Sequence, residues 1–359
     1  MKIIISAGGT GGHIYPALAI LDEFIKNEKK VDVIYVGTHN RMEKDIITNR
    51  GIKYHELKIY GFSKSDMVRN FKNVFYIFKS VKSCEKLIDE FKPDIVIGCG
   101  GYVVYPIIKA AKNKKVPVFI HEQNAIPGKS NKALSKNANL VGISFLSSKN
   151  YFNDAKEVFY SGNPCASNAM NTDVIKREEF GFKKDKKFIV IVSGSLGSVT
   201  LNKTFKNFLK AINKDYQVLY ITGKSHYDEF IKDESFNKNI VIKPYIDNLA
   251  GVIKGSDLII SRAGASTISE ILALEIPSIL IPSPYVANNH QYYNALDLKN
   301  KGVSKMIEEK NLTTDILLNT VNEILNDKAY KDIKDKFKSI EKIDSSKVIY
   351  DKIKEIIKW

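Results

Sequence analysis

Cysteine is scarce in this chain of 359 residues: only Cys84, Cys99 and Cys165 occur, and no two of them form a C-x-x-C pair. This scarcity argues against a disulfide framework and against a thiolate metal site, and it favours a reducing compartment. No apolar run approaches the length of a membrane-spanning helix. The single lysine and three isoleucines before the first serine are too few for a signal peptide, so a cytoplasmic location is expected.

Arginine-rich clusters, zinc-finger spacings and the aromatic motifs of RNA-binding domains are also missing, although the net charge is +15. A charge of this size favours an anionic partner, which can be nucleic acid, a phosphorylated substrate or an acidic membrane surface. The missing motifs argue against nucleic acid. The lysines are spread along predicted helices, for example at 109–115 and 183–187, so charge alone does not choose between the other two partners.

The order of apolar runs divides the chain into two similar halves. Hydrophobic residues make up 44% and charged residues 26%, as in globular proteins, and 359 residues suffice for two domains. Short apolar runs typical of buried strands occur at 3–5, 31–36, 94–97, 116–120 and 140–143, and again at 188–192, 218–221, 240–242, 258–260 and 278–281. Helical patterns separate these runs, which predicts an α/β fold with one doubly wound, Rossmann-like parallel sheet in each half.

We expect the two domains to face each other across a cleft, with the functional loops at the carboxyl ends of their strands. The composition of residues 161–164, Ser-Gly-Asn-Pro, is typical of a hinge and places the boundary there. Residues 345–359 have helical spacing and are expected to pack back on the first domain. The predicted domains are therefore 1–163 with 340–359, and 164–339.

Residues 4–14, Ile-Ile-Ser-Ala-Gly-Gly-Thr-Gly-Gly-His-Ile, are the most informative stretch. A predicted strand at 3–5 runs into four glycines, and a helix is expected to begin near Pro16. Glycines let backbone amides approach a ligand at a helix N-terminus, where the helix dipole favours negative charge. His13 adds a side chain that can take up a proton near neutral pH, so the loop predicts an anion site with chemistry. A plain strand-to-helix turn is the alternative.

Two common nucleotide motifs are not matched. The spacing G-G-x-G-G differs from the dinucleotide motif G-x-G-x-x-G, and the second predicted strand ends in Gly37, where an NAD site needs an acidic residue. Gly223-Lys224-Ser225 resembles the end of a P-loop, but Val218 occupies the required upstream glycine position. Neither an NAD site nor a P-loop is therefore expected.

A second glycine-containing loop follows a predicted strand and reads Ser-Arg-Ala-Gly-Ala-Ser-Thr-Ile-Ser-Glu at 261–270. The free amides of the helix that it opens, with the hydroxyl of Ser266 or Thr267, suit a phosphate. Glu270 lies six residues past Gly264, a separation of about 9 Å along a helix. There its carboxylate can accept both hydroxyls of a ribose whose phosphate lies at the helix tip. An incidental surface glutamate is the alternative.

Two polar clusters lie where loops are expected: His-Glu-Gln-Asn-Ala-Ile-Pro-Gly at 121–128 and Asn-Asn-His-Gln at 288–291. Their amides suit sugar recognition, since each sugar hydroxyl needs a donor and an acceptor. His290 fits a satisfied core histidine as well as a ligand. No D-x-D sequence, by which many sugar transferases hold a diphosphate through a divalent metal, occurs in the chain. We therefore expect no metal or other cofactor, and expect Ser195 and helix N-termini to carry the leaving-group charge.

Together these motifs resemble a family of bacterial glycosyltransferases that act in peptidoglycan synthesis. The matching segments follow the family's order and spacing: GGTGGH at 8–13, GGY at 100–102, HEQNAIPG at 121–128, GNP at 162–164, SRAGAST-SE at 261–270 and HQ at 290–291. The resemblance implies a GT-B fold and inverting transfer of N-acetylglucosamine (GlcNAc) from UDP-GlcNAc to the 4-hydroxyl of N-acetylmuramic acid (MurNAc) in lipid I, giving lipid II. Because lipid I is polyprenyl-linked, the enzyme is expected to be peripheral at the cytoplasmic face of the cell membrane, where it would serve cell shape and division.

The resemblance also implies how the site is divided. The acceptor is expected in the first domain and UDP-GlcNAc mainly in the second. Thr10, Gly11, Gly12 and Asn124 would reach the sugar or the diphosphate. The implied contacts of the second domain are Ser195 with phosphate, the backbone of Ile246 with uracil, Ala265, Ser266, Thr267 and Glu270 with phosphate and ribose, and Gln291 with sugar hydroxyls.

The chain departs from the family at three places. Cys165 and Ala166 follow the G-N-P segment, where the family usually has an arginine near the diphosphate. Leu196 replaces a common glutamine, and Val104 replaces a serine that is common after G-G-Y-x. The missing arginine leaves a gap in charge neutralisation that lysine or helix dipoles would have to fill. It implies weaker donor binding or a changed acceptor.

We expect a single displacement, in which the acceptor hydroxyl attacks the anomeric carbon from the face opposite UDP. His13 is the predicted general base because its unperturbed pKa lies near neutral pH, and Glu122 is the second candidate. Closure of the domains about residues 161–164 would complete the site.

Residues 67–91 are the candidate for docking on an anionic inner-leaflet surface. Phe71, Phe75 and Phe78 share one face of the predicted helix. The lysines near them are Lys72, Lys79, Lys82 and Lys86. Packing of this face into the domain core is the alternative.

Two other functions stay open. One is another GT-B enzyme, either a glycolipid glycosyltransferase with a diacylglycerol acceptor or a UDP-GlcNAc 2-epimerase, against which HEQNAIPG argues. The other is a nucleotide-binding or basic surface protein that has lost its activity. The presence of His13, Glu270 and Gln291 argues against it, and the missing arginine argues for it.

Overall fold

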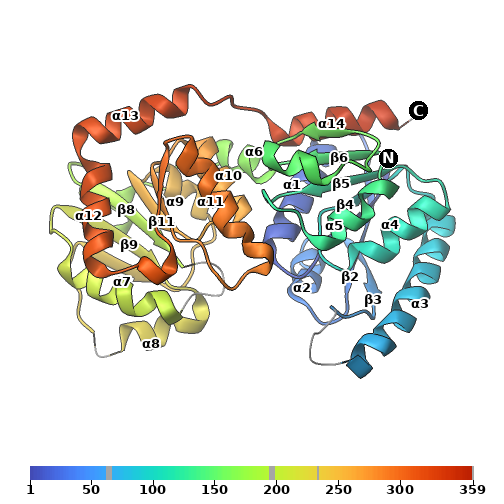
Figure 1. Ribbon diagram of the computed structural model, residues 1–359, viewed down its shortest axis with the longest axis horizontal. Helices are drawn as coiled ribbons and strands as arrows, with labels where there is room; N and C mark the ends of the chain where they lie inside the picture. The colour runs from blue at the N-terminus through green and yellow to red at the C-terminus, as the bar shows by residue number, and fades with distance from the viewer. Residues whose placement is uncertain (62–66, 194–198, 233, 358–359) are drawn as a thin grey trace. The chain divides into compact units, whose positions relative to one another are not determined.

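The computed structural model describes residues 1–61, 67–193, 199–232 and 234–357. The chain forms two compact units (Figure 1). Unit 1 consists of Met1–Ser167 with Ile343–Trp359, and unit 2 consists of Asn168–Lys342. Each unit contains one parallel sheet, and the two sheets belong to separate sequence halves as the order of apolar runs predicts.

Unit 1 is built on a seven-stranded sheet in the order β3-β2-β1-β4-β5-β6-β7. Its strands are β1 (Lys2–Ser6), β2 (Asp32–Thr38), β3 (Lys53–Leu57), β4 (Ile95–Gly98), β5 (Val118–Glu122), β6 (Leu140–Ile143) and β7 (Val158–Tyr160). The strand order reverses between β1 and β4, so the loops after these two strands flank the switch point where α/β sheets bind ligands.

Side chains alternate between the two faces of this sheet. Ile4 and Val96 lie in a buried cluster with residues of α3 and α4, whereas Ile3 and Ile5 pack against α1 and α14 on the other face. Figure 1 shows these helices beside the sheet. The helices of unit 1 are α1 (Gly11–Asn27), α2 (Met42–Thr48), α3 (Met67–Phe91), α4 (Val104–Asn113), α5 (Lys129–Leu134), α6 (Cys165–Met170), which extends into unit 2, and α14 (Ser345–Ile356). Burial on both faces explains why the central strands are apolar throughout.

Unit 2 repeats the plan with a six-stranded sheet in the order β10-β9-β8-β11-β12-β13. Its strands are β8 (Lys187–Val192), β9 (Tyr216–Ile221), β10 (Ile240–Lys243), β11 (Leu258–Ser261), β12 (Ser278–Leu280) and β13 (Ser304–Met306). Its helices are α7 (Val199–Ala211), α8 (Tyr227–Ile231), α9 (Leu249–Lys254), α10 (Ala265–Leu274), α11 (His290–Asn300), α12 (Thr314–Leu325) and α13 (Asp327–Lys338). Here the order reverses between β8 and β11.

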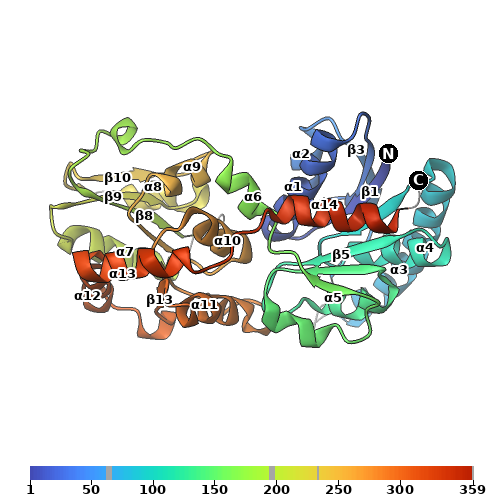
Figure 2. The ribbon, with the colours of Figure 1, turned by 90° about the horizontal axis from the view of Figure 1, so that it is seen from above.

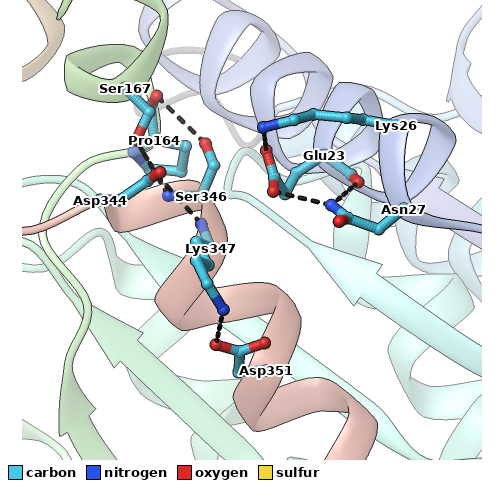
Figure 3. A network of polar contacts seen from close by, with 9 residues as sticks. All are labelled: Glu23, Lys26, Asn27, Pro164, Ser167, Asp344, Ser346, Lys347 and Asp351. Atoms are coloured by element: carbon cyan, nitrogen blue, oxygen red, sulfur yellow. Dashed lines mark hydrogen bonds and ion pairs between the residues drawn. The ribbon is translucent and has the colours of Figure 1, made fainter.

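The chain crosses between the units after Ser167 and after Lys342, whereas the sequence places the boundaries at 163/164 and 339/340. Hydrogen bonds within unit 1 join the two crossing segments (Figure 3). Ser167 Oγ donates to Asp344 Oδ1 at 2.8 Å, and the Ser346 amide donates to Ser167 Oγ at 3.1 Å. α14 then lies along α1, which confirms the predicted return of the C-terminal helix to the first domain (Figure 2).

The apolar runs miss three strands, β3, β7 and β13, all of which lie at a sheet edge. An edge strand has one neighbour and stays partly exposed, so its residues need not be apolar. β3, for example, reads Lys-Tyr-His-Glu-Leu and buries only its last residue. The other predicted strands are confirmed with small differences in their bounds.

Three predictions at the starts and ends of elements are wrong. α1 begins at Gly11, so Pro16 lies inside the helix rather than at its start. His121 and Glu122 are the last residues of β5, not loop residues, because they continue the pairing with β6. In the cluster at 288–291, His290 and Gln291 open α11 instead of lying in a loop.

Candidate active site

The loop after β1 opens α1 with Thr10 as the N-cap residue and Gly11 as the first helical residue. The amides of His13 and Ile14 donate to the Thr10 carbonyl at 3.1 and 3.3 Å. Helix geometry leaves the amides of Gly11 and Gly12 without an intrahelical acceptor. Thr10 and Gly12 are exposed, so these amides and the helix dipole meet solvent at a position suited to an anion.

His13 is oriented by its own loop. Its Nδ1 atom lies 2.8 Å from the Gly8 carbonyl oxygen. A carbonyl oxygen only accepts, so Nδ1 carries the proton and Nε2 keeps its lone pair. Burial lowers the pKa of His13, and the Gly8 carbonyl opposes this shift without reversing it. The imidazole is therefore neutral, with Nε2 as its proton acceptor, at pH values where a free histidine is already partly charged.

The loop after β4 contains the motif GGY at 100–102 and explains why its glycines are needed. Gly100 and Gly101 have φ of +105° and +89°, which side-chain-bearing residues rarely adopt. A Cβ atom at Gly100 would lie 2.7 Å from His13 Cδ2, and one at Gly101 would lie 2.5 Å from the Gly8 carbonyl oxygen. The Gly8 amide donates to the Gly100 carbonyl at 3.2 Å. The loops after β1 and β4 are thus packed tightly together, and their glycines allow the His13 ring to lie against the backbone.

A buried polar network joins these two glycine loops to the segments at 121–128 and 162–164. Gln123 Nε2 donates to the Cys99 carbonyl at 2.9 Å and lies 3.1 Å from His121 Nδ1. His121 Nε2 lies 2.9 Å from the Gly162 carbonyl. Burial lowers the pKa of His121 to about 4, so the ring is neutral and donates through Nε2. His121 and Gln123 therefore hold three loops in register.

Glu122 organises the loop that follows it. Its carboxylate accepts the amide of Asn124 at 3.0 Å, the amide of Gly128 at 3.1 Å, and side-chain NH₂ groups of Asn124 at 3.2 Å and Asn131 at 2.9 Å. Glu122 is 1% exposed, and this burial raises the pKa of its carboxyl group although the hydrogen bonds oppose the shift. The half-buried Asn124 is held by this carboxylate.

In unit 2, α10 begins at Ala265 directly after Gly264, with Ser266 and Thr267 in its first turn. Ser266 Oγ is buried and has no hydrogen-bond partner among the described residues. A buried unpaired hydroxyl is costly, so a ligand acceptor at this helix start would stabilise it. Glu270 lies one turn further on, and burial raises the pKa of its carboxyl group to about 7.

The side chain of Arg262, which precedes this helix, interacts with other residues of unit 2. Its guanidinium forms a largely buried ion pair with Glu309 at 2.6 Å and donates to the Ile281 carbonyl at 3.2 Å. The positive charge is therefore compensated within unit 2.

Gln291 lies close to the start of α10, because α10 and α11 pack together and Asn294 Nδ2 donates to the Ala263 carbonyl at 3.3 Å. Gln291 Oε1 accepts the Ser283 amide at 2.9 Å, which leaves its NH₂ group as the donor end. Asn288 and Asn289, just before α11, have φ of +55° and +50°, an unusual backbone that occurs often at functional sites.

The remaining predicted positions fall into three groups. Ile246 lies in the loop between β10 and α9, at the same sheet edge as the start of α10, since β10 and β11 belong to one parallel sheet. Ser195 and Leu196 lie outside the described residues. Cys165 and Val104 are buried at the starts of α6 and α4, and nothing in the structure explains why they replace the family's usual residues.

The sequence motifs do not indicate four residues that support these groups, Asn131, Ser283, Asn294 and Glu43, and they predict a sugar-binding loop at Gln123, which instead lies in the buried network. Glu43 is fully buried beside the glycine loop, and its Oε1 accepts from the Thr38 amide at 3.3 Å. A Cβ atom at Gly8 would lie 3.0 Å from this oxygen. Only its place shortly after the end of β2 could have indicated Glu43.

The outer face of α3 is not packed into the core. Phe71, Phe75 and Phe78 are 84%, 69% and 70% exposed. The four lysines named above, Lys72, Lys79, Lys82 and Lys86, are exposed as well. Within the part of the chain that is described, no helix is long and apolar enough to cross a membrane.

Comparison with known families gives matches in both units. Residues 3–143 match the N-terminal domain of glycosyltransferase family 28, and residues 188–349 match its C-terminal domain. The chain is 40% identical to a UDP-N-acetylglucosamine–N-acetylmuramyl-(pentapeptide) pyrophosphoryl-undecaprenol N-acetylglucosamine transferase of Bacillus cytotoxicus, over 100% of each chain. It is 43% identical to the protein of that name from Halalkalibacterium halodurans, over 90% of this chain and 91% of the relative.

Solved structures give the same result for the fold. Acinetobacter baumannii MurG matches with a TM-score of 0.79 and 26% identity, over 99% of both chains. A UDP-GlcNAc 2-epimerase of Neisseria meningitidis matches with a TM-score of 0.66 over 99% of this chain and 100% of the other, but its 15% identity carries an argument only for the fold. The predicted GT-B fold with two Rossmann-like domains is confirmed.

Proposed function

Because the chain belongs to glycosyltransferase family 28, we propose that it transfers GlcNAc from UDP-GlcNAc to the 4-hydroxyl of MurNAc in lipid I, giving lipid II. The proposal takes its substrates from the names of relatives that align over the whole chain. The observation that carries it in the structure is the contact of His13 Nδ1 with the Gly8 carbonyl oxygen, which leaves Nε2 as the proton acceptor beside an exposed helix start. Lipid II supply links this activity to wall growth, and so to cell shape and division.

Unit 2 would hold the donor. The first turn of α10 offers free amides and the unpaired hydroxyl of Ser266 to the diphosphate, with Thr267 beside it. Glu270 would accept the ribose hydroxyls, and the NH₂ group of Gln291 would donate to the sugar. Ile246 would meet uracil through its backbone, and Ser195 would contact phosphate. Ala265 completes the helix start.

Unit 1 would hold the acceptor and supply the base. The acceptor hydroxyl attacks the anomeric carbon from the face opposite UDP, the bond to UDP breaks, and His13 Nε2 takes the hydroxyl proton. Thr10, Gly11, Gly12 and Asn124 would contact the sugar or the diphosphate. Glu122 is less suited to act as base, because its carboxylate already accepts four hydrogen bonds from its own loop.

Charge on the leaving diphosphate must be met without the arginine that the family usually has after G-N-P. The dipole of α10 would contribute, since this helix begins at the carboxyl edge of its sheet. Lys224 lies at that edge of unit 2 too, with its Nζ atom 4.8 Å from the centre of the Tyr245 ring. Lys224 is exposed, so its charge is accessible to a bound nucleotide.

The exposed phenylalanines of α3 would dock the enzyme on the anionic inner leaflet, with the flanking lysines at the headgroups. Vesicle sedimentation with phosphatidylglycerol vesicles tests this. Substituting Phe71, Phe75 and Phe78 by serine should abolish binding, while binding that survives the substitutions would contradict the docking surface. The matched control replaces the exposed Tyr151 by serine.

Transfer of labelled GlcNAc from UDP-GlcNAc to a short-chain lipid I analogue, without added metal, tests the activity. Formation of the disaccharide lipid is the expected result. UDP-GlcNAc binding without transfer, or conversion to the 2-epimer, would contradict the proposal and point to one of the other functions of this fold.

A further inference from the structure

Four aromatic side chains of unit 1 form a continuous run from the surface to the sheet edge. The ring centres of Phe75 and Tyr76 are 6.4 Å apart, those of Tyr76 and Tyr60 are 6.1 Å apart, and those of Tyr60 and His39 are 5.5 Å apart. All three contacts are edge-to-face, a favourable arrangement for aromatic rings. We call this set, Phe75, Tyr76, Tyr60 and His39, the aromatic path.

The middle of the aromatic path is locked to α3. Asn73 is 1% exposed and uses its amide twice: Oδ1 accepts the Tyr60 amide at 2.9 Å, and Nδ2 donates to the Tyr60 carbonyl at 2.6 Å. This pair fixes the segment after β3 against the helix. Tyr60 and Tyr76 are only half-buried, so the path keeps an accessible surface.

The two ends of the path lie where a membrane-bound acceptor needs them. Phe75 is 69% exposed and belongs to the phenylalanine face of α3. His39 follows Thr38, the last residue of β2, and β2 pairs in parallel with β1. Since parallel strands end at the same edge, His39 lies at the edge that carries the glycine loop and His13.

We propose that the aromatic path binds the first isoprene units of the acceptor's polyprenyl chain, on the basis of the proposed transfer to a polyprenyl-linked sugar. For its diphosphate to reach the glycine loop, this lipid must draw the adjoining carbons out of the bilayer. Aromatic faces shield those carbons from water.

The test compares two acceptor analogues with the same sugar and diphosphate, one with two isoprene units and one with four. Both are used below micelle-forming concentrations and without vesicles, so that membrane docking plays no part. For the unaltered enzyme we expect kcat/KM to be at least fivefold higher with four units. Tyr60→Ala and Tyr76→Ala should reduce this ratio below twofold and leave the KM for UDP-GlcNAc unchanged. Tyr151→Ala, at an exposed tyrosine elsewhere in unit 1, should keep the full ratio.

Phe75→Ser replaces an exposed side chain, so this variant tests the path without removing a buried contact. It should lower kcat/KM for the four-unit acceptor and leave the two-unit acceptor unchanged, because Phe75 is at the outer end of the path. An unchanged ratio in all three variants would overturn the aromatic path. Absence of transfer to either analogue by the unaltered enzyme would instead overturn the proposed function, so the two failures are distinguishable.

Discussion

The Nδ1 atom of His13 lies 2.8 Å from the carbonyl oxygen of Gly8, five residues earlier in the same loop. This contact decides which ring nitrogen carries the proton, and it leaves Nε2 as the acceptor. The ring also lies against Gly100, where a Cβ atom would come within 2.7 Å of Cδ2. A backbone carbonyl and a glycine thus orient the imidazole without the help of a carboxylate.

Replacing His13 by alanine should reduce kcat by about 10²- to 10⁴-fold, the usual contribution of a general base. In the unaltered enzyme, the acidic limb of the kcat/KM profile should lie below pH 6.5, because burial lowers the pKa of this group in the free enzyme. The profile should lose that limb in H13A. UDP affinity, measured by calorimetry, is the control and should be unchanged, while a near-normal rate in H13A would assign the base elsewhere.

The affinity for UDP should fall as the pH decreases through about 7. Burial raises the pKa of Glu270 to about 7, and only the ionised carboxylate can accept both ribose hydroxyls. Protonation therefore competes with binding, by about tenfold for each pH unit well below 7. Calorimetry with UDP from pH 5.5 to 8.5 checks this. In E270Q the affinity should be weaker and retain only the pH dependence of the nucleotide's own phosphate; an unchanged profile would remove Glu270 from the ribose site.

Two glycine substitutions separate backbone strain from crowding. Gly9 and Gly101 have nearly equal φ, +91° and +89°, but a Cβ atom meets nothing within 4 Å at Gly9 and the Gly8 carbonyl at 2.5 Å at Gly101. Gly9→Ala should lower the free energy of unfolding by about 1 to 3 kcal/mol through strain alone. Gly101→Ala should lower the free energy of unfolding by about 1 to 3 kcal/mol more than Gly9→Ala, because the backbone at Gly8 must move. Denaturant unfolding measures both, and equal losses would show that the loops are not tightly packed.

Acid should destabilise unit 1 through His121. Its pKa is about 4 in the folded chain and about 6.5 when unfolded, so the unfolded state binds the proton first. The contribution to stability is complete above pH 6.5, falls as the pH decreases, and is lost below pH 4, a total of about 3 kcal/mol. Glu122 and Glu270 have raised pKa values and act in the opposite direction.

Comparison of the unaltered chain with His121→Asn therefore isolates the effect of this histidine on the pH dependence of stability. This variant should be less stable at pH 7, because the contact with Gly162 is lost, but its stability should decline less between pH 6.5 and 4. His226→Asn, at a partly exposed histidine in unit 2, should follow the unaltered chain. A parallel decline in H121N and the unaltered chain would contradict the assignment.

Much of the fold follows from local patterns. The central strands are buried on both faces, so they appear in the sequence as apolar runs, and β1, β6 and β11 are found close to their predicted bounds. The edge strands β3, β7 and β13 are missed because partial exposure removes that pattern. The start of α1 is misplaced at Pro16 because a proline signal outweighed the glycines, whose helical conformation has no sequence signal of its own.

The candidate site likewise contains residues that the sequence indicates and residues whose role only the fold reveals. The glycine loop, His13 and the segment at 261–270 are recognisable from residue type and spacing, because anion binding needs free amides and small residues in consecutive positions. The roles of His121 and Glu122 are not recognisable, since polar residues after an apolar run predict an exposed loop. Only pairing with β6 and contact with Gly162 and Asn131 turn these two residues into buried supports.

The sequence by itself determined the α/β class, the two similar halves and the glycine-containing loops that open α1 and α10, because these depend on periodicity and composition along short segments. Tertiary structure alone decided which nitrogen of His13 is free, why Gly100 and Gly101 must be glycine, and that Asn73 fixes Tyr60 beside His39. The physical reason is that these properties arise from contacts that only the folded backbone makes, some within one loop, as between His13 and Gly8, and others between segments far apart in the chain. Direction of a hydrogen bond, crowding of a Cβ position and desolvation of a charge depend on the partner brought near by folding, and the local residue pattern does not contain that partner.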